Sequence, residues 1–150
     1  MIVGVIFLVM LLVPNIIWSF NKPEDYEKYA KNENRILLAF ERIGQILVIV
    51  FSLFFNNYSN NLIITLIIAV IVMILYEIYW FRYFRRDRKM SDMYSDFLKI
   101  PLAGATLPVL AFFLLGIYGQ NVFLIISVII LAIGHIGIHL NHKKEIYDVL

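Results

Sequence analysis

The stretch ILLAFERIGQILVIVFSLFF, from Ile36 to Phe55, decides the class of fold. It is an apolar run whose only charged residues are Glu41 and Arg42. About 17–25 mostly apolar residues are enough to cross a hydrocarbon core roughly 30 Å thick. The run therefore predicts a transmembrane helix, and the two charges inside it call for an explanation.

Four more apolar runs of similar length accompany this one. They cover Ile2–Phe20, Leu62–Phe81, Leu102–Tyr118 and Val122–Leu140. The first has no basic n-region and no small-residue cleavage site, so we expect a retained helix and not a signal peptide. Hydrophobic residues make up 61% of the chain and charged residues 16%, against about 45–50% and 25% in a soluble domain. The sequence predicts an all-α membrane protein, a single domain over residues 1–150 with five transmembrane helices.

The segments between the runs alternate between charged and uncharged. Twelve of the thirteen Lys and Arg residues lie in Lys22–Arg35, Arg82–Lys99 and Asn141–Leu150, whereas Asn56–Asn61 and Gly119–Asn121 carry no charge. Basic loops remain on the cytoplasmic side of a membrane. We therefore expect the N-terminus outside and the C-terminus inside.

Composition also excludes several classes of function. The chain has no cysteine, which rules out a disulfide framework, a thiol nucleophile and a cysteine-bound zinc. Its net charge of +2 does not indicate a nucleic-acid partner. The expected partner is the lipid bilayer, and the sequence is also compatible with a homo-oligomer or with a partner membrane protein.

Two of the basic segments have a pattern of their own. In Met90–Ile100 the apolar residues recur at helical spacing, which predicts a short amphipathic helix on the inner leaflet, ended by Pro101. The basic residues of Arg85–Lys89 predict contact with anionic lipids. An ordinary basic loop is the alternative. Pro23–Asn34 predicts the start of a helix, which could continue into the run that begins at Ile36.

Ionisable side chains inside the runs indicate a polar site within the membrane. They are Glu41, Arg42, Glu77, His135 and His139. Counted from the uncharged segments at about 1.5 Å per helical residue, the first four lie about 21–24 Å from the outer surface. His139 lies one turn closer to the cytoplasm. Three runs thus carry ionisable groups to one layer.

Two amides support this layer. Gln45 shares a helical face with Glu41, and Asn15 follows Pro14 in the first run. The small residues of the fourth run at this depth let helices approach closely or leave space for a ligand. The layer is also open to a structural interpretation, in which Arg42 and Glu77 form an ion pair and the histidines only hydrogen-bond between helices.

Three functions from different classes are consistent with the layer. It could be a cytoplasm-facing pocket that binds or passes a proton, a cation or a small polar ligand. It could be the site of a membrane-embedded enzyme acting on a lipid or another amphipathic substrate. It could also be the structural centre of an accessory or scaffold subunit.

A divalent metal would be the cofactor in one version of the enzyme. His135 and His139 have the i, i+4 spacing that places two imidazoles on one metal, with Glu41 or Glu77 as a third ligand. This spacing alone is a weak signal, and the sequence contains no H-E-x-x-H motif. No nucleophile is evident beside the histidines.

Four stretches carry a resemblance over nearly the whole chain. FERIGQ (Phe40–Gln45), YEIYWFRYF (Tyr76–Phe84), PLAGATLPVLAFFLLGIYG (Pro101–Gly119) and GHIGIHLNH (Gly134–His142) resemble a group of small, uncharacterised bacterial multi-pass membrane proteins. The resemblance implies a bacterial inner-membrane location and carries no activity. The five-run layout is also similar to that of isoprenylcysteine-type membrane methyltransferases. Their R-H-P cofactor motif is missing here, so that function is not carried over.

Overall fold

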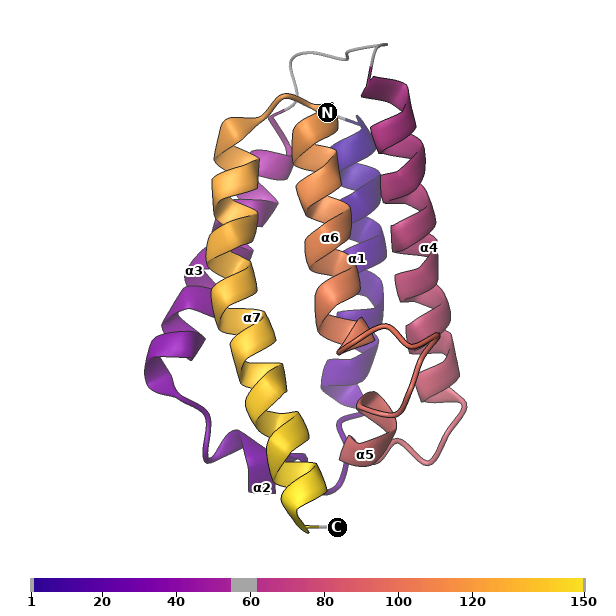
Figure 1. Ribbon diagram of the computed structural model, residues 1–150, viewed down its shortest axis with the longest axis vertical. Helices are drawn as coiled ribbons and strands as arrows, with labels where there is room; N and C mark the ends of the chain where they lie inside the picture. Colours follow the sequence, from indigo (N-terminus) through magenta and orange to yellow (C-terminus); the bar gives the residue numbers. More distant parts are fainter. Residues whose placement is uncertain (1, 55–61, 150) are drawn as a thin grey trace.

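The computed structural model describes residues 2–54 and 62–149. In these ranges the chain forms seven helices and no strand (Figure 1), which confirms the all-α class. The helices are α1 (Ile2–Phe20), α2 (Tyr26–Ala30), α3 (Arg35–Ser52), α4 (Ile63–Phe84), α5 (Met90–Met93), α6 (Ala103–Tyr118) and α7 (Val122–Val149). The uncharged segment 56–61 and the last residue, Leu150, lie outside the described residues.

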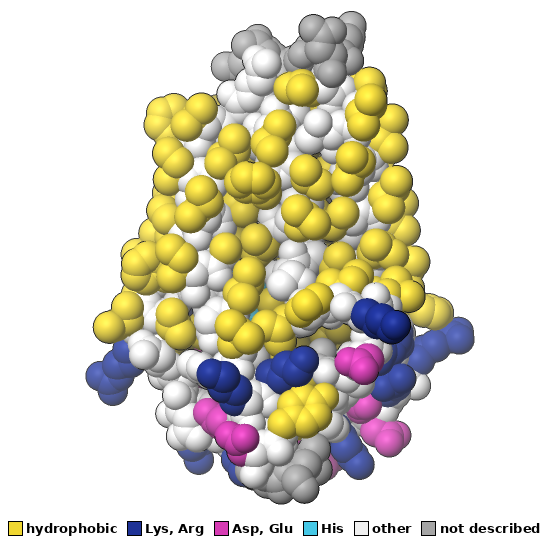
Figure 2. All heavy atoms as spheres, in the orientation of Figure 1, with side chains coloured by type: hydrophobic (Ala, Val, Ile, Leu, Met, Phe, Trp, Pro, Cys, Tyr) yellow, Lys and Arg dark blue, Asp and Glu magenta, His cyan; other side chains and the backbone are white. Residues whose placement is uncertain are grey.

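The outer surface of the helices is that of a membrane protein. Among the described residues, α1, α4 and the Val122–Asp148 part of α7 are long and apolar enough to cross a membrane. α6 is apolar but shorter, and α3 carries three charged residues. Figure 2 shows hydrophobic side chains over the long sides of the molecule, with Lys, Arg, Asp and Glu gathered at the end where α2 and α5 lie. A surface this apolar needs lipid to cover it.

Helix boundaries follow the apolar runs to within a few residues. α1 has the predicted limits, while α4 and α7 continue past their runs to Phe84 and Val149. α3 ends at Ser52, and the predicted end of this run at Phe55 is outside the described residues. Charged and polar residues beyond an apolar run do not stop a helix. The apolar run Val122–Leu140 is therefore shorter than α7.

The prediction of an amphipathic helix over Met90–Ile100 is wrong. Only Met90–Met93 is helical, and Leu98 and Lys99 have left-handed backbone conformations with φ of 51° and 58°. Tyr94 and Phe97 are each only 6% exposed and pack against the bundle, whereas Leu98 is 67% exposed. This segment therefore closes the charged end of the bundle.

The segment before α3 is broken and does not continue into that helix. α2 covers five residues only, and α3 begins after Asn34. The Asn34 side chain accepts hydrogen bonds from the Ile36 and Leu37 backbone amides at 2.8 and 3.3 Å, which caps α3. The break places Glu33 beside the bundle instead of on the surface of a long helix.

Glycines fix the closest helix contacts. A Cβ at Gly134 of α7 would meet the backbone of Leu37 and Glu41, and one at Gly44 of α3 would meet the backbone of Leu131. The two helices can therefore cross this closely only because these side chains are absent. α7 also packs on α6 and α6 on α4, whereas α1 makes lighter contacts with α3, α4 and α6 (Figure 1).

Candidate functional site

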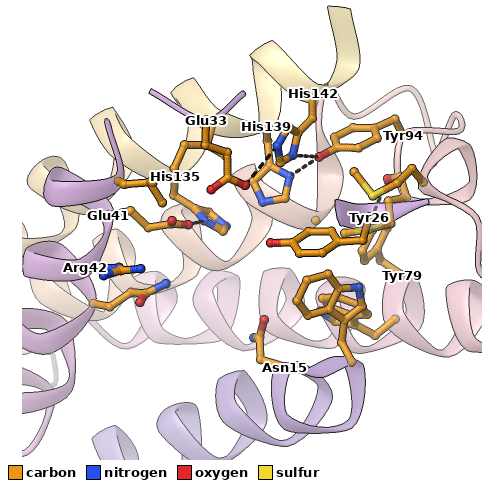
Figure 3. A pocket seen from close by; sticks show the side chains of 18 residues that line it. Asn15, Tyr26, Glu33, Glu41, Arg42, Tyr79, Tyr94, His135, His139 and His142 are labelled. Atoms are coloured by element: carbon orange, nitrogen blue, oxygen red, sulfur yellow. Dashed lines mark hydrogen bonds and ion pairs between the residues drawn. The ribbon is translucent and has the colours of Figure 1, made fainter. Parts of the chain in front are cut away.

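A cavity of about 310 Å³ lies near the charged end of the bundle, and we name it the polar cavity. Every described helix and the loops after α2 and α5 contribute to it. Its lining residues are Asn15, Trp18, Tyr26, Glu33, Leu38, Glu41, Arg42, Gln45, Tyr79, Trp80, Met90, Met93, Tyr94, Gly104, His135, Ile138, His139 and His142. Figure 3 shows side chains from α3 and α7 directed toward the same space, with Tyr26 and Asn15 on other sides of it.

The pair of Glu41 and His135 forms one wall. Glu41 Oε1 and His135 Nδ1 are 2.5 Å apart, and the side chains are 17% and 19% exposed. The Nδ1–H group donates to the carboxylate, which orients the imidazole. Gly134, next to His135, permits the close crossing of α3 and α7 that brings the two groups together.

A second polar cluster continues along α7 toward its C-terminus. The Tyr94 hydroxyl lies 2.7 Å from His139 Nδ1 and 3.3 Å from His142 Nδ1 (Figure 3). Burial raises the pKa of Tyr94 well above its ordinary value, so the hydroxyl keeps its proton and can donate to one imidazole while accepting from the other. The His135 and His139 rings are 4.6 Å apart between centroids, which brings the two clusters into contact.

Glu33 completes this cluster. Its Oε1 lies 3.1 Å from His142 Nε2, close enough for an ion pair although not aligned for a hydrogen bond. Burial raises the pKa of Glu33, the nearby Glu41 carboxylate adds to the rise, and the Arg42 guanidinium opposes it. With its proton on Nε2, the His142 imidazole presents a positive edge to the Glu33 carboxylate, so the contact is favourable.

Arg42 and Gln45 stand at the edge of the polar cavity. Both are exposed, in contrast to all the other side chains that line it. Among the described residues, no carboxylate lies within ion-pair distance of Arg42. The cavity therefore has an unpaired cation at its rim.

A smaller cavity of about 230 Å³, which we name the apolar cavity, adjoins the polar one. Its lining is mostly aliphatic and aromatic, with Leu131, Val48 and Phe112 among the buried members. The two cavities share Asn15, Gln45 and His135. The Asn15 amide is held there by hydrogen bonds to the Leu11 carbonyl at 2.6 Å and the Tyr76 hydroxyl at 2.7 Å.

The structure brings six of the seven candidate site residues together around the polar cavity. They are Asn15, Glu41, Arg42, Gln45, His135 and His139. Glu77 lines neither cavity, and its Oε1 is buried without a hydrogen-bond partner among the described residues. The ion pair considered between Arg42 and Glu77 is not formed.

The metal set suggested by the sequence is not assembled. No group of three or more His, Asp or Glu side chains in residues 2–54 and 62–149 is arranged to hold a metal ion. Glu41 faces Nδ1 of His135, while Nδ1 of His139 faces the Tyr94 hydroxyl. The residues present therefore do not fit a divalent metal in this arrangement.

Glu33, Tyr94 and His142 belong to the site but are not among the residues that the sequence predicts for it. His142 continues the stripe of His135 and His139 at helical spacing, which was a usable signal. Glu33 and Tyr94 lie outside the transmembrane runs, and nothing in their local pattern links them to α7. The one sequence feature that marks Tyr94 is its hydroxyl group among the apolar residues of the Met90–Ile100 pattern.

Comparisons with known proteins identified no relative. No family model, curated protein or solved structure matches the chain.

Proposed function

We propose that this protein crosses the bacterial inner membrane five times, with its N-terminus outside, and binds a small polar ligand in the polar cavity from the cytoplasmic side. The observation that carries the proposal is the cavity of about 310 Å³ walled by ionisable side chains of several helices. The basic segments lie at the same end of the molecule (Figure 2), which supports a cytoplasmic opening.

The size of the cavity favours a ligand site over a purely structural network. Polar groups that serve only to join helices pack against each other, because protein interiors are as dense as organic crystals. Small-molecule pockets are about 300–1,000 Å³ and combine apolar walls with a few directed polar groups. The polar cavity falls at the lower end of this range.

The chemistry of the lining suits a polar or charged ligand. Arg42 and Gln45 offer donors at the rim, and Asn15 offers an oxygen acceptor deeper in. Glu41 and His135 add a carboxylate and an imidazole to this lining. A donor group of the ligand, or a cation that accompanies it, would bind at the Glu41 carboxylate.

A reaction on a lipid is the second candidate. The Glu41–His135 pair could act as a general base beside the apolar cavity that adjoins it. The hydroxyl of Thr106, near the start of α6, hydrogen-bonds to the Pro101 carbonyl at 2.9 Å, and Thr106 lines neither cavity. Binding therefore has more support than covalent catalysis.

Native mass spectrometry of the protein purified in a mild nonionic detergent tests the binding function. We expect the wild-type chain to carry a non-covalently bound small molecule that Glu41→Gln loses, because the amide does not hold the His135 imidazole as the carboxylate does. Glu27→Gln is the matched control, since Glu27 is exposed on α2 and does not line the cavity. A bare wild-type chain, in spectra gentle enough to preserve bound annular lipid, would contradict the proposal.

A further inference from the structure

The two cavities lie side by side, one with a polar and one with a largely apolar lining. They meet at Asn15, Gln45 and His135, which line both. Beyond this junction the apolar cavity is enclosed chiefly by leucine, valine, isoleucine and phenylalanine from α1, α3, α6 and α7. A ligand that fills both parts must itself have a polar end and an apolar end.

The exposed residues of the lining lie on α1 and α3, so we infer that the site opens between these two helices. Of all the residues that line the two cavities, only Leu12 on α1 and Arg42 and Gln45 on α3 are exposed. α1 and α3 pack lightly on each other, in contrast to the close crossing of α3 and α7. At the depth expected for Arg42, this opening lies on the side of the bundle at the level of the inner leaflet and continues toward the charged cytoplasmic end.

The charge at this opening selects the headgroup. Arg42 has no carboxylate within ion-pair distance among the described residues, whereas Glu41 and Glu33 each have a histidine partner. A guanidinium at this depth is costly unless an anion or water satisfies it. Its planar donors match two oxygens of a phosphate or carboxylate group.

Taking the ligand site proposed above as given, we propose that its ligand is an amphiphile of the inner leaflet with an anionic oxyanion headgroup. The headgroup lies in the polar cavity against Arg42, and the alkyl chain lies in the apolar cavity. The ligand enters sideways between α1 and α3. Met90, Met93 and Tyr94 are buried in the lining at the charged end of the site.

Fluorescence titration of the full chain in nonionic detergent tests this inference with defined probes. The two tryptophans of the chain, Trp18 and Trp80, both line the polar cavity, so their emission reports binding there. The probes are dodecyl phosphate, inorganic phosphate and dodecanol. We expect a saturable change with dodecyl phosphate at concentrations where the other two give none, because only this probe has both the charge and the chain.

Two pairs of variants test where the two ends of dodecyl phosphate bind: the phosphate at Arg42 and the alkyl chain in the apolar cavity. Arg42→Gln should weaken dodecyl phosphate binding by about tenfold to a hundredfold through the loss of a charge-assisted hydrogen bond. Arg35→Gln, a neighbouring exposed arginine outside the lining, should change it by less than about twofold. Val109→Phe, which fills the apolar cavity, should weaken binding by about tenfold, while Leu110→Phe, exposed on the same helix, should not.

The probes separate failure of this inference from failure of the binding function. Saturation by inorganic phosphate alone would overturn the amphiphile and leave a site for a free anion. Binding of dodecanol as tight as that of dodecyl phosphate would overturn the anionic headgroup. An unchanged affinity of folded Arg42→Gln for dodecyl phosphate would also overturn the anionic headgroup. If no probe binds while native mass spectra still contain a non-lipid adduct sensitive to Glu41→Gln, only the amphiphile is wrong.

Discussion

Replacing His135 by leucine is expected to lower the free energy of unfolding by about 3 kcal/mol. The imidazole is the hydrogen-bond partner of the Glu41 carboxylate at 2.5 Å, and both side chains are mostly buried. Leaving a buried acceptor without its donor costs about 1–3 kcal/mol, and more when the acceptor is charged. The upper end of this range applies here, because the acceptor is a carboxylate and leucine offers it no donor.

A double-mutant cycle measures this coupling. Unfolding in detergent, followed by circular dichroism, is compared for His135→Leu, Glu41→Leu and the double variant. The double variant should be more stable than the sum of the single losses predicts, because it no longer buries an unpaired carboxylate. Additivity within about 0.5 kcal/mol would mean that the two side chains are not coupled.

Introducing a side chain at Gly134 is expected to have the largest effect on assembly. A Cβ there would lie 2.8 Å from the Glu41 Cα and closer still to the Leu37 carbonyl oxygen and the Glu41 amide nitrogen. Backbone atoms of α3 cannot move aside without separating the helices, so Gly134→Leu should give little or no folded protein. Gly134→Ala should already cost about 1–3 kcal/mol through overpacking.

Gly137 provides the control on the same helix. A Cβ at Gly137 would meet only side-chain atoms of Leu37, at 3.0 and 3.1 Å, and a leucine side chain can adjust. Gly137→Ala should therefore elute as a single peak in size-exclusion chromatography and unfold near the wild-type temperature. A Gly134→Ala protein that unfolds within about 2 °C of wild type would show that α3 and α7 do not cross this closely.

Hydropathy predicted the helices because each apolar run is bounded by polar or turn-forming residues. The limits of α1 and the break before α6 follow directly from this pattern. The segment after α4 could not be predicted in the same way. An amphipathic pattern over Met90–Ile100 shows that one face is covered, but it does not tell whether lipid or protein covers it. In the structure, Tyr94 and its neighbours are covered by protein.

The sequence predicts those site residues for which it gives both the depth in the membrane and the face of the helix. Glu41 and Gln45 share a face of α3, and His135 and His139 share a face of α7, so the polar cavity contains all four. Residue counting gave Glu77 the same depth, but depth does not fix the rotation of a helix. The buried face of α4 carries Tyr76, Tyr79, Trp80 and Tyr83, and of these neighbours only Tyr79 and Trp80 reach the polar cavity.

Residues from connecting segments could not be predicted, since their positions depend on tertiary structure. Glu33 reaches His142 because the chain is broken between α2 and α3. Tyr94 reaches His139 and His142 because the segment after α5 folds under the bundle. Neither contact has a periodic signature in the sequence.

Cysteine labelling measures whether water reaches the polar cavity from the cytoplasmic side, as a ligand site with a cytoplasmic opening requires. The natural chain has no cysteine, so Gln45→Cys and Ile46→Cys each introduce a single thiol. Both positions are exposed on α3, but only Gln45 lines the cavities. A charged, membrane-impermeant methanethiosulfonate reagent, which modifies only hydrated thiolates, is applied to inside-out and right-side-out vesicles. We expect labelling of Gln45→Cys in inside-out vesicles alone and no labelling of Ile46→Cys in either orientation. Equal protection of both thiols in inside-out vesicles, or labelling of Gln45→Cys from the outer side, would contradict this expectation.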